Sequence, residues 1–152
     1  MTSGRLLGID HGLKRIGLAV SDVSGLVARE LTVLNRKTNR EDFERINRIA
    51  TEHKAVGIVV GLPINSDAEA GEYTQADTVR RWVERFAETT RLPITLWDEQ
   101  LTSADARELS IRQGRKRREA IDDLAARLIL QSYLDALRDG LATPPSYHHT
   151  EE

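Results

Sequence analysis

Hydrophobic positions near the start of the chain form three short segments separated by turn-prone residues. Residues 5–10 end in an acid that is soon followed by Gly12, and Arg15–Ser21 runs into the turn-rich sequence SDVSG. Residues 26–34 have a pattern that suits a third strand. A parallel crossover needs about a dozen or more residues, so segments this close together predict strands that pair antiparallel.

The next segment has the periodicity of a helix. Asn39, with Asp42 three residues later, is a favourable helix start. Apolar side chains then recur at helical spacing at Phe43, Ile46, Ile49 and Ala50. Ala55–Leu62 is apolar on both alternating sets of positions, which is typical of a strand buried between two layers.

Helical and extended patterns continue to alternate beyond Pro63. They predict a helix from about residue 70 to 89, a strand over 93–98, a helix near 103–113 and a helix over 120–137. Strands that alternate with helices favour parallel pairing. The sequence therefore predicts an α/β fold with a mixed five-stranded sheet, three antiparallel strands followed by parallel ones, and helices on both faces. One domain is expected over residues 1–140, and the aperiodic segment 141–152 is expected to be disordered.

The composition narrows the class of protein. With 152 residues, the chain has room for one hydrophobic core of ordinary size. The absence of cysteine excludes disulfides, thiolate nucleophiles and cysteine-based zinc or iron–sulfur sites. The sequence has neither an apolar run of about 18 residues nor a secretion-signal pattern, so a cytoplasmic protein with no membrane partner is expected.

Basic residues are unevenly distributed. The net charge of −2 argues weakly against a nucleic-acid partner, yet 18 of the 22 basic residues are arginine, which favours bidentate phosphate contacts. The run 112–118 contains five basic residues, namely Arg112, Arg115, Lys116, Arg117 and Arg118. This run is either a solvated loop or a phosphate-binding surface. Lys14 and Arg15, after the first strand, are further candidates for phosphate contact.

Three acids stand at the ends of apolar elements. Asp10 ends the first strand, Glu99 follows the strand over 93–98, and Asp122 opens the last helix. In open α/β sheets, ligands bind beyond the carboxyl ends of strands. Converging carboxylates repel one another unless divalent cations neutralise them, and oxygen ligands suit Mg²⁺ or Mn²⁺. Two such ions can activate water for cleavage of a phosphodiester.

Each acid also has a structural interpretation. Asp10 suits a turn, because Asp close before Gly is common there. Glu99 suits a solvated loop, and Asp122, together with Asp123, suits the N-terminal end of a helix dipole. Taken singly, these interpretations are at least as favourable as catalysis.

Four sequence blocks resemble the YqgF family, whose members are RNase H-like, Holliday-junction-resolvase-like nucleases, also described as pre-16S rRNA nucleases. The resemblance extends from about Gly4 to Gly140 and keeps the blocks in family order. They are residues 8–22 (GIDHGLKRIGLAVSD), 59–65 (VVGLPIN), 98–106 (DEQLTSADA) and 121–135 (IDDLAARLILQSYLD).

The resemblance implies an RNase H-like fold and metal-dependent phosphodiester hydrolysis. By position, it implies that Asp10, Glu99 and Asp122 are the catalytic residues that hold two Mg²⁺ or Mn²⁺ ions. Asp122 is preferred to Asp123 because it directly follows the apolar residue of the family pattern. One departure is Gln100, which stands where the family usually carries arginine, and this puts phosphate binding at that position in doubt.

Three classes of function follow. The first is a nuclease that processes the 5′ end of precursor 16S rRNA in ribosome biogenesis, and a close alternative cleaves branched DNA junctions. The second is a non-catalytic nucleic-acid-binding module, against which the complete acid triad argues. The third, a kinase or ATPase of the actin-like superfamily, needs a second domain for which the chain is too short. A monomer or a homodimer is compatible with the sequence.

Overall fold

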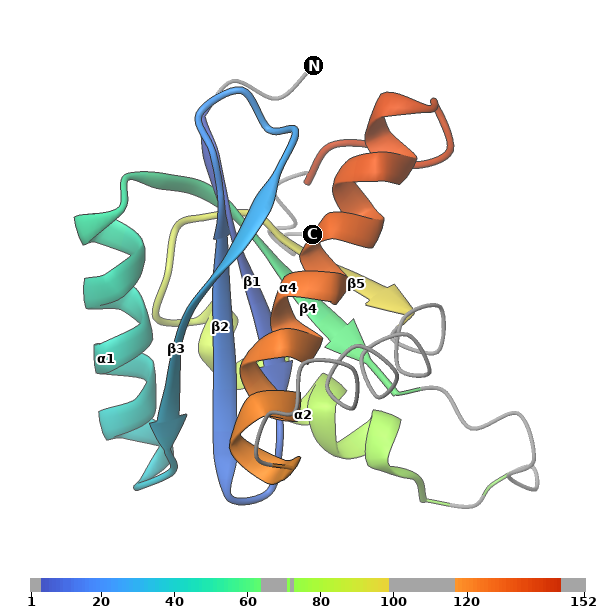
Figure 1. The fold of residues 1–152 in the computed structure, drawn as a ribbon. Coiled ribbons are helices and arrows are strands. Elements are labelled where there is room, and N and C mark those ends of the chain that lie inside the picture. The colour runs from blue at the N-terminus through green and yellow to red at the C-terminus, as the bar shows by residue number, and fades with distance from the viewer. Residues whose placement is uncertain (1–3, 64–70, 72, 99–116, 146–152) are drawn as a thin grey trace.

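A five-stranded sheet in the order β3-β2-β1-β4-β5 forms the centre of the protein (Figure 1). The computed structural model describes residues 4–63, 71, 73–98 and 117–145, and gives only the backbone for 117–123. In chain order the elements are β1 (Arg5–His11), β2 (Arg15–Ser21), β3 (Ala28–Asn35), α1 (Asn39–Glu52), β4 (Ala55–Leu62), α2 (Gln75–Ala87), β5 (Ile94–Asp98) and α4 (Arg117–Arg138). The predicted order of these elements is confirmed, and the helix predicted near 103–113 lies outside the described residues.

The strand pairing confirms the predicted mixed sheet. β2 pairs antiparallel with both β1 and β3, whereas β1 pairs with β4 and β4 with β5 in parallel. β1 is therefore the central strand and is buried on both faces. In the parallel part, Ile9 lies opposite Val60, and Leu62 lies opposite Asp98. The three parallel strands consequently end at one edge of the sheet, which we call the carboxyl edge.

Two hydrophobic cores lie on opposite faces of the sheet. One packs under α1 and α2, where Phe43, Trp82 and Phe86 form an aromatic cluster. The other packs under α4, where Tyr133 meets Trp97 of β5 with ring centroids 5.3 Å apart. Helices thus cover both faces, as predicted. None of the helices in the described part of the chain has the length and apolar character needed to cross a membrane.

Gly8 allows α4 to lie directly on the central strand. A Cβ atom at this position would be 2.8 Å from Leu130 Cβ and 3.2 Å from the Ala126 carbonyl oxygen. Because Cβ contacts under about 3 Å do not occur in relaxed structures, only glycine fits beneath this turn of the helix. The missing side chain therefore sets the position of α4 relative to β1.

β3 begins two residues later than the sequence pattern predicts. The Asp22 carboxylate accepts hydrogen bonds from the backbone N–H groups of Leu26 (2.9 Å) and Val27 (3.0 Å). Bonds of this kind hold the backbone in a turn and compete with strand pairing. The strand accordingly begins at Ala28, whose N–H donates to Gln131 Oε1 of α4 at 2.8 Å.

The ends of the helices also differ from the prediction. The N-cap of α1 is Thr38 and not Asn39. α4 begins at Arg117, three residues before the predicted start, so Arg117 and Arg118 belong to the helix and not to a loop. The sequence of this first turn, RREA, contains good helix formers and neither glycine nor proline, which explains the earlier start.

Residues 141–145, which follow α4, pack against the domain. The Tyr133 hydroxyl donates a hydrogen bond to the Thr143 carbonyl, and Ala142 packs against the core under α4. Pro145 lies close to Gly57 of β4, where a Cβ would be 3.2 Å from its Cγ. The part of the expected disordered segment from 146 to 152 lies outside the described residues.

Replacing Thr38 with alanine is expected to lower the free energy of unfolding by about 1 kcal/mol. The Thr38 hydroxyl accepts from the Glu41 N–H at 3.1 Å, and Glu41 Oε1 accepts from the Thr38 N–H at 3.3 Å, which forms a capping box. Urea denaturation of Thr38→Ala and Thr38→Ser measures the effect. Serine keeps the hydroxyl, so an equal loss in both variants would contradict the capping role.

Candidate active site

Asp10 lies at the carboxyl edge on the face of the sheet that α4 covers. Side chains alternate along β1, and Leu7 and Ile9 belong to the core under α1 and α2. Leu6 belongs to the opposite core, and Gly8 lies beneath α4. Asp10 continues this second set and is half-buried. Its carboxylate is therefore on the α4 side of the central strand.

The N-terminal end of α4 lies at the same end of the sheet as the turn between β1 and β2 (Figure 1). Ala126 contacts the position of Gly8, and Asp122 precedes it by one turn of the same helix. One helical turn advances about 5.4 Å and two strand residues about 6.8 Å, so residue 122 and residue 10 lie at a similar level. The structure thus brings the Asp122 backbone toward the α4-covered side of β1.

The third predicted acid follows β5. This strand ends at Asp98 on the carboxyl edge, and Glu99 is the next residue in the sequence but lies outside the described residues. Two residues before Glu99, Trp97 packs against the core under α4, on the same face as Asp10. Among the side chains that the structure describes, no three metal-ligating groups lie together, and those of Glu99 and Asp122 are not among them.

The predicted phosphate-binding residues fall into two groups. Lys14 lies at the carboxyl edge in the turn after β1, and Arg15 is the first residue of β2; a 2.9 Å bond from the Gly12 N–H to the Arg15 carbonyl closes this turn. The Lys14 side chain is exposed there. For the basic run, the structure describes only the backbones of Arg117 and Arg118, at the start of α4, and the other members, Arg112, Arg115 and Lys116, lie outside the described residues.

His11 is buried on the face opposite Asp10. Its side chain is 5% exposed, and its ring centroid lies 4.8 Å from that of Trp82. Burial, and next the nearby Arg36 guanidinium, lower the pKa of His11 to about 4. His11 Nε2 lies 3.1 Å from Arg36 Nη1, and because a guanidinium only donates, Nε2 accepts and Nδ1 carries the proton. The imidazole is therefore neutral near pH 7.

A buried carboxylate, Asp42, anchors Arg36 from the first turn of α1. Its side chain is fully buried and accepts from Arg36 Nε at 3.3 Å, the Lys37 N–H at 3.0 Å and Arg45 Nη2. Buried carboxylates need partners of this kind to offset their lost hydration. Arg36 has no local sequence signal, because its partners His11 and Gly12 are more than 20 residues away and the inward direction of Asp42 does not follow from helical spacing.

The chemistry of the edge fits a hard divalent cation such as Mg²⁺ or Mn²⁺. The described donor on the α4 face is the Asp10 carboxylate, and the chain contains no thiol. His11 provides no nitrogen ligand here, because its ring lies on the other face with Nε2 engaged by Arg36 and Nδ1 protonated. An oxygen-only donor set favours Mg²⁺ or Mn²⁺ over zinc.

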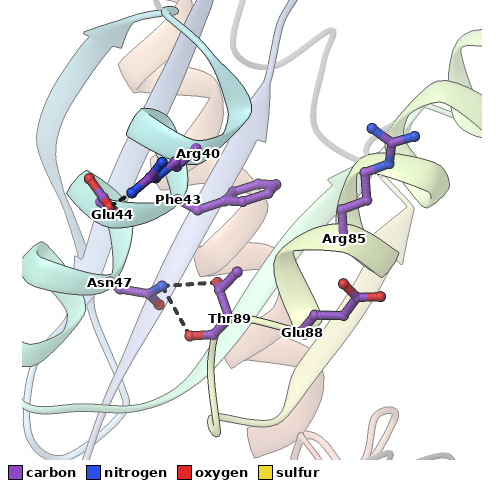
Figure 2. Close-up of a pocket in the computed structure, with 7 residues that line it drawn as sticks. All are labelled: Arg40, Phe43, Glu44, Asn47, Arg85, Glu88 and Thr89. Carbon is purple, nitrogen blue, oxygen red and sulfur yellow. Dashed lines mark hydrogen bonds and ion pairs between the residues drawn. The ribbon is translucent and has the colours of Figure 1, made fainter.

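A separate groove of about 670 Å³ lies between α1 and α2 (Figure 2). Asn47 Nδ2 bridges its two walls by donating to the Thr89 carbonyl at 3.3 Å and to Thr89 Oγ1 at 3.0 Å. The two arginines and two glutamates that line it balance in charge, so the groove lacks the positive charge that favours phosphate binding. The lining residues are Arg40, Phe43, Glu44, Asn47, Arg85, Glu88 and Thr89.

The sequence matches a known family over most of its length. A family model described as "RuvX: Holliday junction resolvase" matches residues 4–136. The chain belongs to the RuvX family. A relative from Thermoanaerobacter pseudethanolicus is 45% identical over 139 residues, which cover 89% of this chain and 99% of the relative. One from Rhodopseudomonas palustris is 46% identical, covering 89% and 83%. Both are named "Putative pre-16S rRNA nuclease", which confirms the family indicated by the sequence motifs.

Solved structures support the RNase H-like fold expected of a RuvX protein. RuvC from Thermus thermophilus, in complex with a Holliday junction substrate, superposes with a TM-score of 0.64. The match covers 93% of this chain and 99% of RuvC, at 18% sequence identity. At that identity the likeness shows the fold alone, and it confirms the predicted fold class.

Proposed function

We propose that this RuvX-family protein is a cytoplasmic, metal-dependent nuclease that hydrolyses phosphodiester bonds at the 5′ end of precursor 16S rRNA. The position of Asp10 carries the proposal, because a half-buried carboxylate stands one residue before the end of the central strand, on the face covered by α4. The relatives' shared name supports ribosomal RNA as the substrate. The fold and the family both agree with phosphodiester hydrolysis.

Asp10, Glu99 and Asp122 would hold the metal, and the basic residues would hold the substrate. When bound, Mg²⁺ or Mn²⁺ ions acidify water and stabilise the leaving oxygen of a phosphodiester. The carboxylates fix the ligand geometry, and α4, seated on Gly8, keeps Asp122 at the level of Asp10. Lys14 and Arg15, together with the basic run 112–118, bind backbone phosphates without reading sequence.

Cleavage of branched DNA is a second candidate function. The description of the family model as a Holliday junction resolvase favours it. The chemistry would be the same, with a four-way junction in place of a precursor RNA. Because symmetric cleavage of a junction calls for two equivalent active sites, a homodimer is expected in that case. A monomer in solution would favour the RNA substrate.

Parallel cleavage assays with Mg²⁺ and with Mn²⁺ test the proposal directly. Precursor 16S rRNA and a four-way DNA junction are incubated with the protein under identical conditions, and products are mapped at nucleotide resolution. Cleavage of the precursor near its mature 5′ end is expected, and EDTA is expected to stop it. Preferential junction cleavage would support the second candidate, and activity on neither substrate would leave a non-catalytic binding module. Binding of Mn²⁺, measured by calorimetry, separates that module from a nuclease.

Lys14→Gln is expected to weaken RNA binding and to reduce the slope of log affinity against log salt concentration by about 1. The Lys14 side chain is exposed at the carboxyl edge, where a phosphate can reach it. Binding is measured in EDTA, so that the RNA remains intact. Lys54→Gln is the matched control, because exposed Lys54 directly precedes β4 and lies at the opposite edge. Equal salt slopes for Lys14→Gln and the wild type would exclude the phosphate contact.

A further inference from the structure

Arg36 holds the turn that directly follows Asp10. Its backbone N–H donates to the Lys14 carbonyl at 2.9 Å. Its Nη1 donates to the Gly12 carbonyl at 3.3 Å and to His11 Nε2 at 3.1 Å. Three of the four residues after Asp10 are therefore bonded to this one arginine.

The other side of the Arg36 guanidinium is fixed to α1. Nε pairs with the buried Asp42 carboxylate at 3.3 Å, and Nη2 donates to Asn39 Oδ1 at 2.8 Å. The Arg36 side chain itself is 18% exposed. A planar guanidinium with bonds on every nitrogen has little freedom to rotate, and α1 is in turn anchored in the hydrophobic core. The turn is thus tied to a rigid element on the far face of the sheet.

We infer that Arg36 is a positioning residue that sets the location of the Asp10 carboxylate for metal binding and of Lys14 for phosphate binding. The inference rests on the proposed function. Arg36 touches neither side chain, and it acts through the backbone of the turn and the ring of His11. One side chain thereby couples the metal ligand to the substrate contact.

The direction of the contacts distinguishes positioning from simple stabilisation. Asp42 has a second arginine partner, Arg45, which also donates to the Asn35 carbonyl at 2.8 Å. None of the hydrogen bonds described for Arg45 goes to residues 10–14. Both arginines therefore stabilise the same buried carboxylate, but Arg36 alone of the two is bonded to the turn. Groups that hydrogen-bond directly to a metal ligand change metal affinity by about 10- to 100-fold when they are removed, and Arg36, which acts one step further away, is expected at the lower end of that range.

The test compares Arg36→Lys with the matched control Arg45→Lys. Both substitutions keep the positive charge. At position 36, the lysine ammonium cannot bond to His11, Gly12, Asp42 and Asn39 at once, so the contacts with the turn are lost. Calorimetric titration with MnCl₂ is expected to show about 10-fold weaker binding for Arg36→Lys and less than about 2-fold change for Arg45→Lys. Cleavage by Arg36→Lys is expected to show a lower kcat, because Asp10 is displaced, and a higher KM, because the same arginine positions Lys14. Thermal melts of both variants serve as the control, and comparable losses of stability are expected because both arginines bond to Asp42.

Asn39→Ala provides a milder second variant if Arg36→Lys does not fold. It removes the Nη2 acceptor and leaves the Asp42 pair intact, so a several-fold loss of Mn²⁺ affinity is expected. Wild-type Mn²⁺ affinity in these variants, or an equal loss in Arg45→Lys, overturns the inference. If Asp10→Asn binds Mn²⁺ as tightly as the wild type, the proposed metal site itself falls, and the inference with it. If Asp10→Asn loses binding and Arg36→Lys does not, the inference alone falls.

Discussion

Asp10→Asn is expected to reduce cleavage by on the order of 10³-fold or more while leaving the fold intact. The amide has the size of the carboxylate but lacks its charge, and a hard divalent cation binds an amide oxygen far more weakly than a carboxylate. Asp10 is half-buried at the end of a fully paired strand, so the substitution disturbs no core packing. Single-turnover cleavage of precursor rRNA with Mg²⁺ measures the loss.

Metal-dependent stability gives an independent measurement of the same site. A ligand present at 100 times its dissociation constant stabilises a protein by about 2.7 kcal/mol, so the melting temperature of the wild type should rise with added Mn²⁺. That rise should be absent in Asp10→Asn. Asp139→Asn is the matched control, because Asp139 is an exposed acid just after α4, at the other end of the helix. An active Asp10→Asn protein would refute the assignment of Asp10 as a metal ligand.

The sheet was predictable because its signals are local. Short spacings force the first three strands to be antiparallel, and the continuous apolar run of β4 predicts burial on both faces, which the structure shows from Gly57 to Leu62. The strand order then places β1 at the centre, with β4 and β5 on one side. From that order alone, Asp10 and the end of β5 share an edge. The alternation of side chains along β1 also shows which residues share a face with Asp10. Which helix covers that face is known only from the structure.

The start of α1 shows why local sequence signals do not predict every helix cap. Thr38 and Asn39 are both favourable N-cap residues, and the sequence favoured Asn39. In the structure the Asn39 amide oxygen accepts from Arg36 Nη2, and the Thr38 hydroxyl caps the helix instead. The N-cap residue is therefore determined by a tertiary contact, because the same Arg36 is bonded to the turn after β1, more than 20 residues away in sequence. Neither the cap nor the proposed positioning role of Arg36 can be predicted without that tertiary contact.

The net charge also gives little information about the candidate site, because it is an average over the whole chain. A net charge of −2 conceals an acid and a cation, Asp10 and Lys14, placed four residues apart around one turn. The acid lies on the half-buried strand end, whereas the cation is exposed at the tip. Under the proposed function, this turn would supply both a metal ligand and a phosphate contact, and their opposite charges cancel in the average over the chain.

Gly8→Ala is expected to lower the free energy of unfolding by about 1–3 kcal/mol and to impair the active site as well. The new Cβ would lie 2.8 Å from Leu130 Cβ, an atom fixed to the helix backbone, and 3.2 Å from the Ala126 carbonyl. Neither atom can rotate away, so α4 has to move off β1. The gain from restricting the unfolded chain, about 0.4–1 kcal/mol, is smaller than this cost.

Movement of α4 would carry residue 122 away from the level of Asp10, so Mn²⁺ affinity should fall together with stability. Gly57→Ala on β4 is the matched control, because its Cβ would meet the end of the rotatable Leu6 side chain at 3.0 Å and Pro145 Cγ at 3.2 Å. Those neighbours can shift without moving α4, so a smaller loss of stability and unchanged Mn²⁺ affinity are expected. Urea denaturation and calorimetry measure the two effects. A Gly8→Ala protein with wild-type stability would mean that α4 is not held at the central strand by this contact, and a destabilised one with wild-type Mn²⁺ affinity would separate the helix position from the metal site.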